Sequence, residues 1–264
     1  MVQHDVFGDY TARDFQAILD CCMNYKITLA YNGKNYEGWQ MQREKPTIQL
    51  ALTQAVSKIE GAPVIVHAAG RTDAGVHAEG QVVSFHLSQA WEARKLRNAL
   101  NGNLPSDIRV IEAVPVDDEF HARFSAHSKI YRYQIYNAEV WHPLLEPLTW
   151  HYPYEINPQR LQDEAQALIG THDFTVFTVN SCMTKTRIRT ITKIDIKVDG
   201  ALIQLFFNGK GFLRYQVRTM VAALLEINRG RISMSMKELI ESQQRTLIRG
   251  TAPAKGLTLM SVEY

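Results

Sequence analysis

The chain has 264 residues, 45% of them hydrophobic and 21% charged, a composition that is ordinary for one large or two small globular domains and that excludes a disordered protein. No apolar run approaches the roughly 18–20 residues of a membrane span, residues 1–14 show no basic n-region, and the three cysteines lack disulfide or zinc spacing, so we expect a cytoplasmic protein without structural metal. The net charge of +2 does not by itself indicate a nucleic-acid partner, but residues 1–125 carry a net −3 (12 Lys and Arg, 15 Asp and Glu) and residues 126–264 a net +5 (17 and 12).

The first half of the chain predicts a βαββαβ unit over residues 25–125. Residues 1–24 precede it as an extension with a short helix, because Phe15, Ile18, Leu19 and Cys22 repeat on one helical face. In the unit, a helix begins after Thr47, a suitable cap, and ends before Gly61. The remaining predicted elements are strands over residues 25–31, 63–67, 81–87 and 108–116 and a second helix over 91–100.

The second half predicts the same order of elements over residues 126–264, with one added helix. Apolar and polar residues alternate over 192–198, and Asp199-Gly200 then supplies a hairpin turn to a strand over 201–208. Further strands are expected over 129–136 and 256–264, and helices over 158–169, closed by Gly170, 213–228 and 235–244. Two such ferredoxin-like units can place their sheets edge to edge and leave a cleft at the join.

One loop, residues 69–81, carries an unusual density of special residues. Gly70, Gly75 and Gly80 surround a single carboxylate, Asp73, and Arg71 stands two residues before it. Glycine suits positions where the backbone takes positive φ or approaches a ligand, so the loop is predicted to present Asp73. A plain structural turn is the simpler alternative. A phosphate-binding loop is excluded, because the Lys and Ser/Thr that should follow its second glycine are missing.

Residues 70–78, Gly-Arg-Thr-Asp-Ala-Gly-Val-His-Ala, resemble the active-site motif of the TruA family of pseudouridine synthases. Further motifs similar to that family follow in the same order at residues 120–126, 131–133, 170–175, 211–213, 216–218 and 250–257. The resemblance covers roughly residues 25–264. It implies the pseudouridine synthase fold, an α/β (α+β) fold in which two ferredoxin-like βαββαβ units share one continuous, mainly antiparallel sheet with a central cleft. The extension and residues 219–223 depart from the family pattern, which leaves a different target position open.

The resemblance implies an isomerase that converts uridine to pseudouridine in the anticodon arm of tRNA. Asp73 would be the catalytic carboxylate, acting as nucleophile or base, with Arg218 against it in a two-point contact. Tyr131 would pack on the flipped uracil, with Tyr133 a weaker candidate, and Arg71 would help to move the nucleotide out of its stack. Nothing is oxidised and no group is imported, so no cofactor is expected.

Contacts with the RNA are predicted at basic and aromatic residues, mostly in the positively charged half. These are Phe120, His121, Arg123, Lys185, Arg187, Arg189, Lys210 and Arg214. His67 and His77 lack a third metal ligand in view and are predicted to be structural. The family works as a homodimer that binds one tRNA across both subunits. A non-catalytic RNA-binding module, a paralogue with a different RNA target and, remotely, an acid/base hydrolase using Asp73 and His77 are the alternatives.

Overall fold

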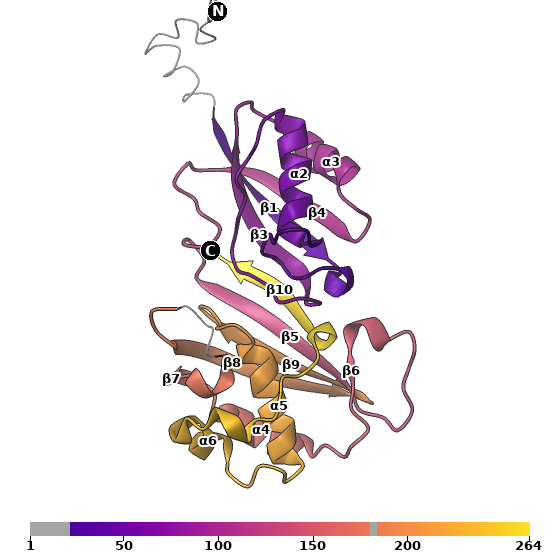
Figure 1. Ribbon diagram of the computed structural model, residues 1–264, viewed down its shortest axis with the longest axis vertical. Coiled ribbons are helices and arrows are strands. Elements are labelled where there is room, and N and C mark those ends of the chain that lie inside the picture. Colours follow the sequence, from indigo (N-terminus) through magenta and orange to yellow (C-terminus); the bar gives the residue numbers. More distant parts are fainter. Residues whose placement is uncertain (1–21, 180–183) are drawn as a thin grey trace, which may run out of the picture.

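The computed structural model describes residues 22–179 and 184–264, so most of the predicted extension lies outside the described residues. A single sheet of ten strands forms the centre of the molecule (Figure 1). Its main path runs in the order β4-β1-β3-β10-β5-β9-β8-β7, with β2 beside β3 and β6 beside β5. This mixed architecture with one large, mostly antiparallel sheet confirms the predicted fold class.

The first unit has the predicted order of elements. Thr47 caps α2, since its Oγ1 accepts a hydrogen bond from the Leu50 amide at 3.3 Å, and Gly61 follows the helix in the left-handed conformation with φ 78°. The elements are β1 (Met23–Tyr31), α2 (Ile48–Glu60), β2 (His67–Ala68), β3 (His77–Leu87), α3 (Ala93–Asn103) and β4 (Ile108–Val116).

The second unit repeats this order with additions. Its hairpin turns at Gly200, and Ser235 forms a capping box with Glu238 at the start of α6. The elements are β5 (Ser128–Tyr136), β6 (Trp150–His151), α4 (Pro158–Gln166), β7 (Gly170–Asp173), β8 (Ile188–Asp199), β9 (Leu202–Gly209), α5 (Gln216–Asn228), α6 (Met236–Ser242) and β10 (Leu257–Glu263).

Several local expectations were wrong. Strand β8 begins four residues before the predicted start at residue 192. The strand predicted over 63–67 is reduced to the two residues of β2, and β3 begins four residues before the predicted start at Gln81. Gly170 does not end a helix but begins β7, which pairs with β8 at the edge of the sheet, and α4 stops at Gln166. Strands β6 and β7 have only two and four residues, so they leave little periodicity to detect.

The last strand of the chain joins the two units. β10 lies between β3 and β5, parallel to β3 through Thr258 and Leu259 and antiparallel to β5. Gly80 of β3 permits this approach, because a Cβ atom there would collide with the carbonyl oxygen of Met260. The continuous sheet therefore depends on a glycine of the first unit and the final strand of the second.

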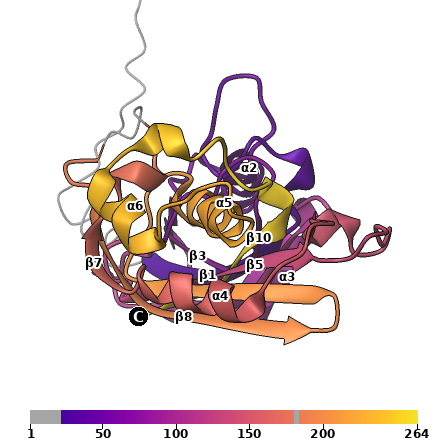
Figure 2. The ribbon, with the colours of Figure 1, turned by 90° about the horizontal axis from the view of Figure 1, so that it is seen from below.

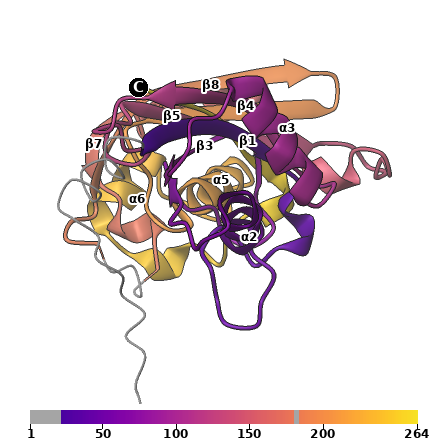
Figure 3. The same ribbon diagram turned by 90° about the horizontal axis from the view of Figure 1, so that it is seen from above.

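Helices of both units cover the same face of the sheet. Viewed along the long axis, α2 and α5 lie on the same side of the sheet (Figures 2 and 3), and Figure 1 shows them apart along that axis, α2 on the first unit and α5 on the second. Their apolar faces bury one hydrophobic core, whose largest members include Tyr25, Phe85, Phe174 and Phe207. Among the described residues, none of the helices is long and apolar enough to cross a membrane. Both units thus contribute helices to this face, and α5 carries Arg218.

Candidate active site

The loop between β2 and β3 is anchored by backbone hydrogen bonds and presents Asp73 beside the join of the two units. The amide of Trp39 donates to the Thr72 carbonyl oxygen at 3.0 Å, and the amide of Val76 donates to the Asp73 carbonyl oxygen at 3.1 Å. Gly75 has φ 76°, a conformation that favours glycine, and its amide donates to the Tyr36 carbonyl oxygen at 3.1 Å. The glycine in this motif therefore has a conformational reason, and the loop is a fixed support for the carboxylate.

Arg218 contacts Asp73 across 145 positions of sequence, from the first turn of α5. Its Nη1 lies 3.4 Å from Asp73 Oδ2, and the two side chains are only 12% and 18% exposed. The other guanidinium nitrogens bind elsewhere: Nε donates to the Ala252 carbonyl oxygen at 2.7 Å, and Nη2 donates to Thr251 Oγ1 at 3.4 Å. The expected two-point contact is therefore wrong, because the guanidinium divides its donors between Asp73 and residues 251–252.

Burial and the nearby cations act in opposite directions on Asp73. Desolvation raises the pKa of the Asp73 carboxyl above its ordinary value of 3.8, while the charges of Arg218 and Arg214 lower it, and burial has the larger effect. The cations thus limit, without cancelling, the cost of holding a charge at a mostly buried position. A carboxylate in this setting is poorly hydrated and so more basic than one in water.

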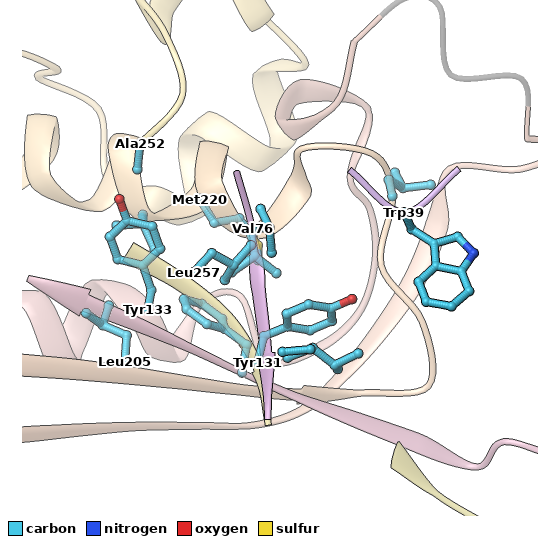
Figure 4. Close-up of a cluster of buried hydrophobic side chains, with 14 of the residues drawn as sticks. Trp39, Val76, Tyr131, Tyr133, Leu205, Met220, Ala252 and Leu257 are labelled. Carbon is cyan, nitrogen blue, oxygen red and sulfur yellow. The ribbon is translucent and has the colours of Figure 1, made fainter. Parts of the chain in front are cut away.

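Tyr131 lies on β5 near the carboxylate, in the apolar wall of the site. Its ring meets Phe212 edge-on with centroids 5.3 Å apart, and it is drawn among buried side chains in Figure 4. Burial, with smaller effects of Tyr31 and Asp73, raises the pKa of its hydroxyl, so Tyr131 is a neutral phenol at physiological pH. The structure thus brings Asp73, Arg218 and Tyr131 into one site.

Tyr133, the weaker candidate, belongs to the core. Its hydroxyl points toward Ala252 in Figure 4 and donates to the Pro253 carbonyl oxygen at 2.8 Å. The ring packs against Gly256, where a Cβ atom would lie 2.6 Å from it. Tyr133 is fully buried and supports the segment that holds Arg218.

The other predicted substrate and RNA residues are dispersed around this site. Arg71 is exposed, as are Arg123, Lys185, Lys210 and Arg214. Arg187 and Arg189 are half-buried, and Arg189 Nη1 donates to the carbonyl oxygens of its own neighbours Thr186 and Ile188. The exposed cations are available to phosphates, whereas Arg189 is partly engaged with its own backbone.

Phe120 and His121, although adjacent in sequence, have different surroundings. Phe120 packs on Tyr264 with ring centroids 4.9 Å apart, and Lys26 Nζ lies 5.8 Å from its centroid. His121 instead stacks between His67 and Phe124, at centroid distances of 4.7 and 4.4 Å. Phe120 is thus a packing residue, and His121 is part of a partly exposed aromatic row.

His77 has a structural bond. Its Nδ1 accepts a hydrogen bond from the Gly33 amide at 3.1 Å, and burial lowers its pKa, so the ring is neutral at physiological pH. This agrees with the structural interpretation and gives no support to a hydrolase in which His77 assists Asp73.

Several residues of the site were missed by the sequence analysis. Tyr31 hydrogen-bonds Thr72 beside the carboxylate at 2.9 Å, and Lys129 Nζ donates to the Ala69 carbonyl oxygen at 2.7 Å. Burial lowers the pKa of Lys129 to about 8. Tyr31 and Lys129 lie in ordinary strand patterns, so nothing in the sequence marks them as neighbours of the loop.

The fold, two joined ferredoxin-like units on one continuous sheet, is that of the pseudouridine synthase class. The chain belongs to the tRNA pseudouridine synthase family, whose model matches residues 27–125 and 165–264. It is 43% identical to tRNA pseudouridine synthase A of Limosilactobacillus reuteri (strain DSM 20016), over 91% of this chain and 96% of that protein. Identity is 39% to tRNA pseudouridine synthase A of Streptococcus pyogenes serotype M3 (strain ATCC BAA-595 / MGAS315), over 92% and 99%.

A more distant likeness is found among solved structures. A chain of the structure titled "Crystal Structure of a Cbf5-Nop10-Gar1 Complex" aligns with a TM-score of 0.36 and 10% identity, over 76% of this chain and 53% of that chain. Family membership rests on the sequence relatives.

Proposed function

We propose that this member of the tRNA pseudouridine synthase family isomerises a uridine in the anticodon arm of tRNA, with Asp73 as the catalytic carboxylate. The observation that carries this assignment is the contact between Asp73 and Arg218, mostly buried and located where the two units join. A protein that only binds RNA gains nothing from a carboxylate held away from water, because a carboxylate repels phosphate. A reaction that needs an ionised group in a water-poor site does gain from it.

The chemistry requires a carboxylate close to C1′ and C6 of the target nucleoside. The N1–C1′ bond breaks, the uracil turns, a C5–C1′ bond forms, N1 gains a proton and the C5 proton leaves to water, so the atoms balance without an oxidant or a donor group. Asp73 can attack C6 or C1′, or remove the C2′ proton. Arg218 would keep Asp73 ionised, and the neutral Tyr131 would offer a ring face to the flipped base.

We further propose that the RNA is held by the exposed cations of the second half and that the protein acts as a cytoplasmic homodimer. Arg71 would meet the target nucleotide, and Lys210 and Arg214, on the segment leading into α5, would meet its flanking phosphates. A surface suited to a second copy is the segment after β5, where four large apolar side chains are exposed, namely Val140, Trp141, Leu144 and Leu148. The molar mass of the Leu144→Glu variant in solution, measured by light scattering beside that of the unchanged protein, tests this surface.

The experiment that tests the function is tritium release from tRNA. An unmodified tRNA transcript with tritium at C5 of its uridines is incubated with the protein, and tritium released to water is counted. We expect release with the unchanged protein, none with Asp73→Asn, and full release with Asp199→Asn, a matched change in the exposed hairpin turn. Transcripts in which single anticodon-arm uridines are replaced by cytidine then locate the target.

Three outcomes contradict parts of this assignment. Binding of tRNA without release would favour an RNA-binding module or another RNA target. Release from uridines outside the anticodon arm would overturn the target assignment alone. Full activity of Asp73→Asn would remove the carboxylate from the mechanism.

A further inference from the structure

Tyr215, immediately before α5, has an unusual backbone. Its φ is 64° and its ψ is −2°, and within residues 22–179 and 184–264 only Glu44 and Gln243 share a positive φ among non-glycine residues. An aromatic residue in this left-handed region is strained, and such strain persists only where the surroundings enforce it. The surroundings here are a tight turn, in which the Gln216 amide donates to the Leu213 carbonyl oxygen at 3.1 Å and Gln216 Oε1 accepts from the Leu213 amide at 2.8 Å.

The ring of Tyr215 contacts both arginines whose charges act on Asp73. The guanidinium carbons of Arg214 and Arg218 lie 4.9 and 5.3 Å from its centroid, and Arg214 Nη2 is 3.1 Å from its hydroxyl oxygen. Two guanidinium groups this close to one ring repel each other, and the negative face of an aromatic ring offsets that repulsion. Arg218 has separate anchors at residues 251–252, whereas the described contacts of the Arg214 guanidinium are with Tyr215.

We propose that Tyr215 is a positioning residue, whose ring holds Arg214 and Arg218 together beside the Asp73 carboxylate. This inference rests on the proposed function of Asp73. It explains why a strained aromatic residue stands at the start of α5, where a cap such as Ser or Asp would be the ordinary choice. The strained turn directs the ring to the two cations, and the gain is a carboxylate that stays ionised although mostly buried.

Three variants distinguish the effect of the Tyr215 ring from the effects of its backbone conformation and of packing alone. Tyr215→Phe keeps the ring, Tyr215→Asn removes it but suits the left-handed backbone better, and Tyr154→Asn is the matched control. Tyr154 also stacks on an arginine, Arg229, at 3.4 Å from its centroid, on another part of the surface. Each variant is measured for thermal melting, for kcat and KM of tritium release, and for kcat against pH.

The expected results differ between the variants. Tyr215→Asn should melt no lower than the unchanged protein, yet lose kcat at least about tenfold, with a smaller change in KM, because cation–π contacts shielded from water are lost. The acid limb of its pH profile should move to higher pH, since the cations that favour ionised Asp73 are less well held. Tyr215→Phe should stay within about threefold of the unchanged kcat, and Tyr154→Asn should leave kcat and the profile unchanged.

A measurement without substrate separates this proposal from the proposed function. Titration of the carbon-13-labelled Asp73 carboxyl by NMR should give a higher pKa in Tyr215→Asn than in the unchanged protein. If the unchanged protein releases no tritium, the proposed function fails, and this titration still tests Tyr215. An unchanged titration in Tyr215→Asn, or a kcat loss no greater than its loss of folded protein, would overturn the positioning role. So would inactivity of a folded Tyr215→Phe, which would assign the effect to the hydroxyl.

Discussion

The contact between Asp73 and Arg218 can be tested as a coupling energy. The perturbation is a double-mutant cycle of Asp73→Asn, Arg218→Met and the double variant, measured as free energy of unfolding in urea at pH 7. Unit charges 3.4 Å apart interact by about 1 kcal/mol at the permittivity of water and about 5 kcal/mol at that of a protein surface. Because the pair is mostly buried but makes one hydrogen bond instead of a bidentate contact, we expect a coupling energy of about 2–3 kcal/mol.

The two single variants should lose different amounts of stability. Arg218→Met leaves a buried carboxylate without its cation and removes the bonds to residues 251–252, so a loss of about 3–5 kcal/mol is expected. Asp73→Asn leaves an arginine that still has those partners and relieves the burial of a charge, so its effect should be about 1 kcal/mol or less.

The pH dependence of Asp73→Asn has a defined sign. The pKa of Asp73 is raised in the folded state, so between the unfolded value of 3.8 and the folded value the folded protein binds more protons. The stability that Asp73 contributes is therefore fully present below pH 3.8 and is lost as pH rises through the folded pKa. The unchanged protein should lose stability relative to Asp73→Asn over this window.

An exposed pair provides the control for the cycle. Lys193 Nζ and Asp195 Oδ2 are closer, at 2.7 Å, but their side chains are 65% and 45% exposed. If burial decides the strength, this pair should couple by about 1 kcal/mol or less. A coupling of Asp73 to Arg218 no larger than that of the control pair would refute the reasoning, as would an Asp73→Asn variant less stable than Arg218→Met.

Three further predictions concern other parts of the fold. The pKa of Lys129 is lowered to about 8, so the stability that Lys129 contributes is lost as pH falls through that value. Between pH 8 and pH 10.5, the free energy of unfolding of the unchanged protein should rise by up to about 3 kcal/mol relative to that of Lys129→Met. Urea unfolding measures this difference. Gly80→Ala should lower the free energy of unfolding by about 3 kcal/mol, because the added methyl group displaces Met260 at the join. Gly102→Ala, in open space on a helix, should raise it by about 0.5–1 kcal/mol. Equal urea midpoints of the two variants would contradict this. Tyr131→Phe should retain most tritium release because it keeps the ring face that would meet the base, and Tyr131→Ala should lose it. An inactive Tyr131→Phe would show that the hydroxyl is needed.

Much of the fold could be predicted from the sequence because its signals are local. Helix α2 is marked by the cap at Thr47 and the left-handed Gly61, and the β8–β9 hairpin by alternation and a turn at Gly200. Each signal reports on residues a few positions apart. The Asp73 loop could be singled out for the same reason, since its glycines and its carboxylate are neighbours in the chain.

The tertiary structure alone decided how distant segments meet. The place of β10 between the units and the ring of Tyr215 on two arginines leave no pattern in either partner. The contact of Arg218 with Asp73 was expected from the resemblance to a known family, but no pattern around either residue predicts it. A strand's periodicity shows which face is buried but not which strand lies beside it. Likewise an arginine in the first turn of a helix has the same sequence signature whether it meets water, a phosphate or a carboxylate, because burial and partner arise only when the chain has folded.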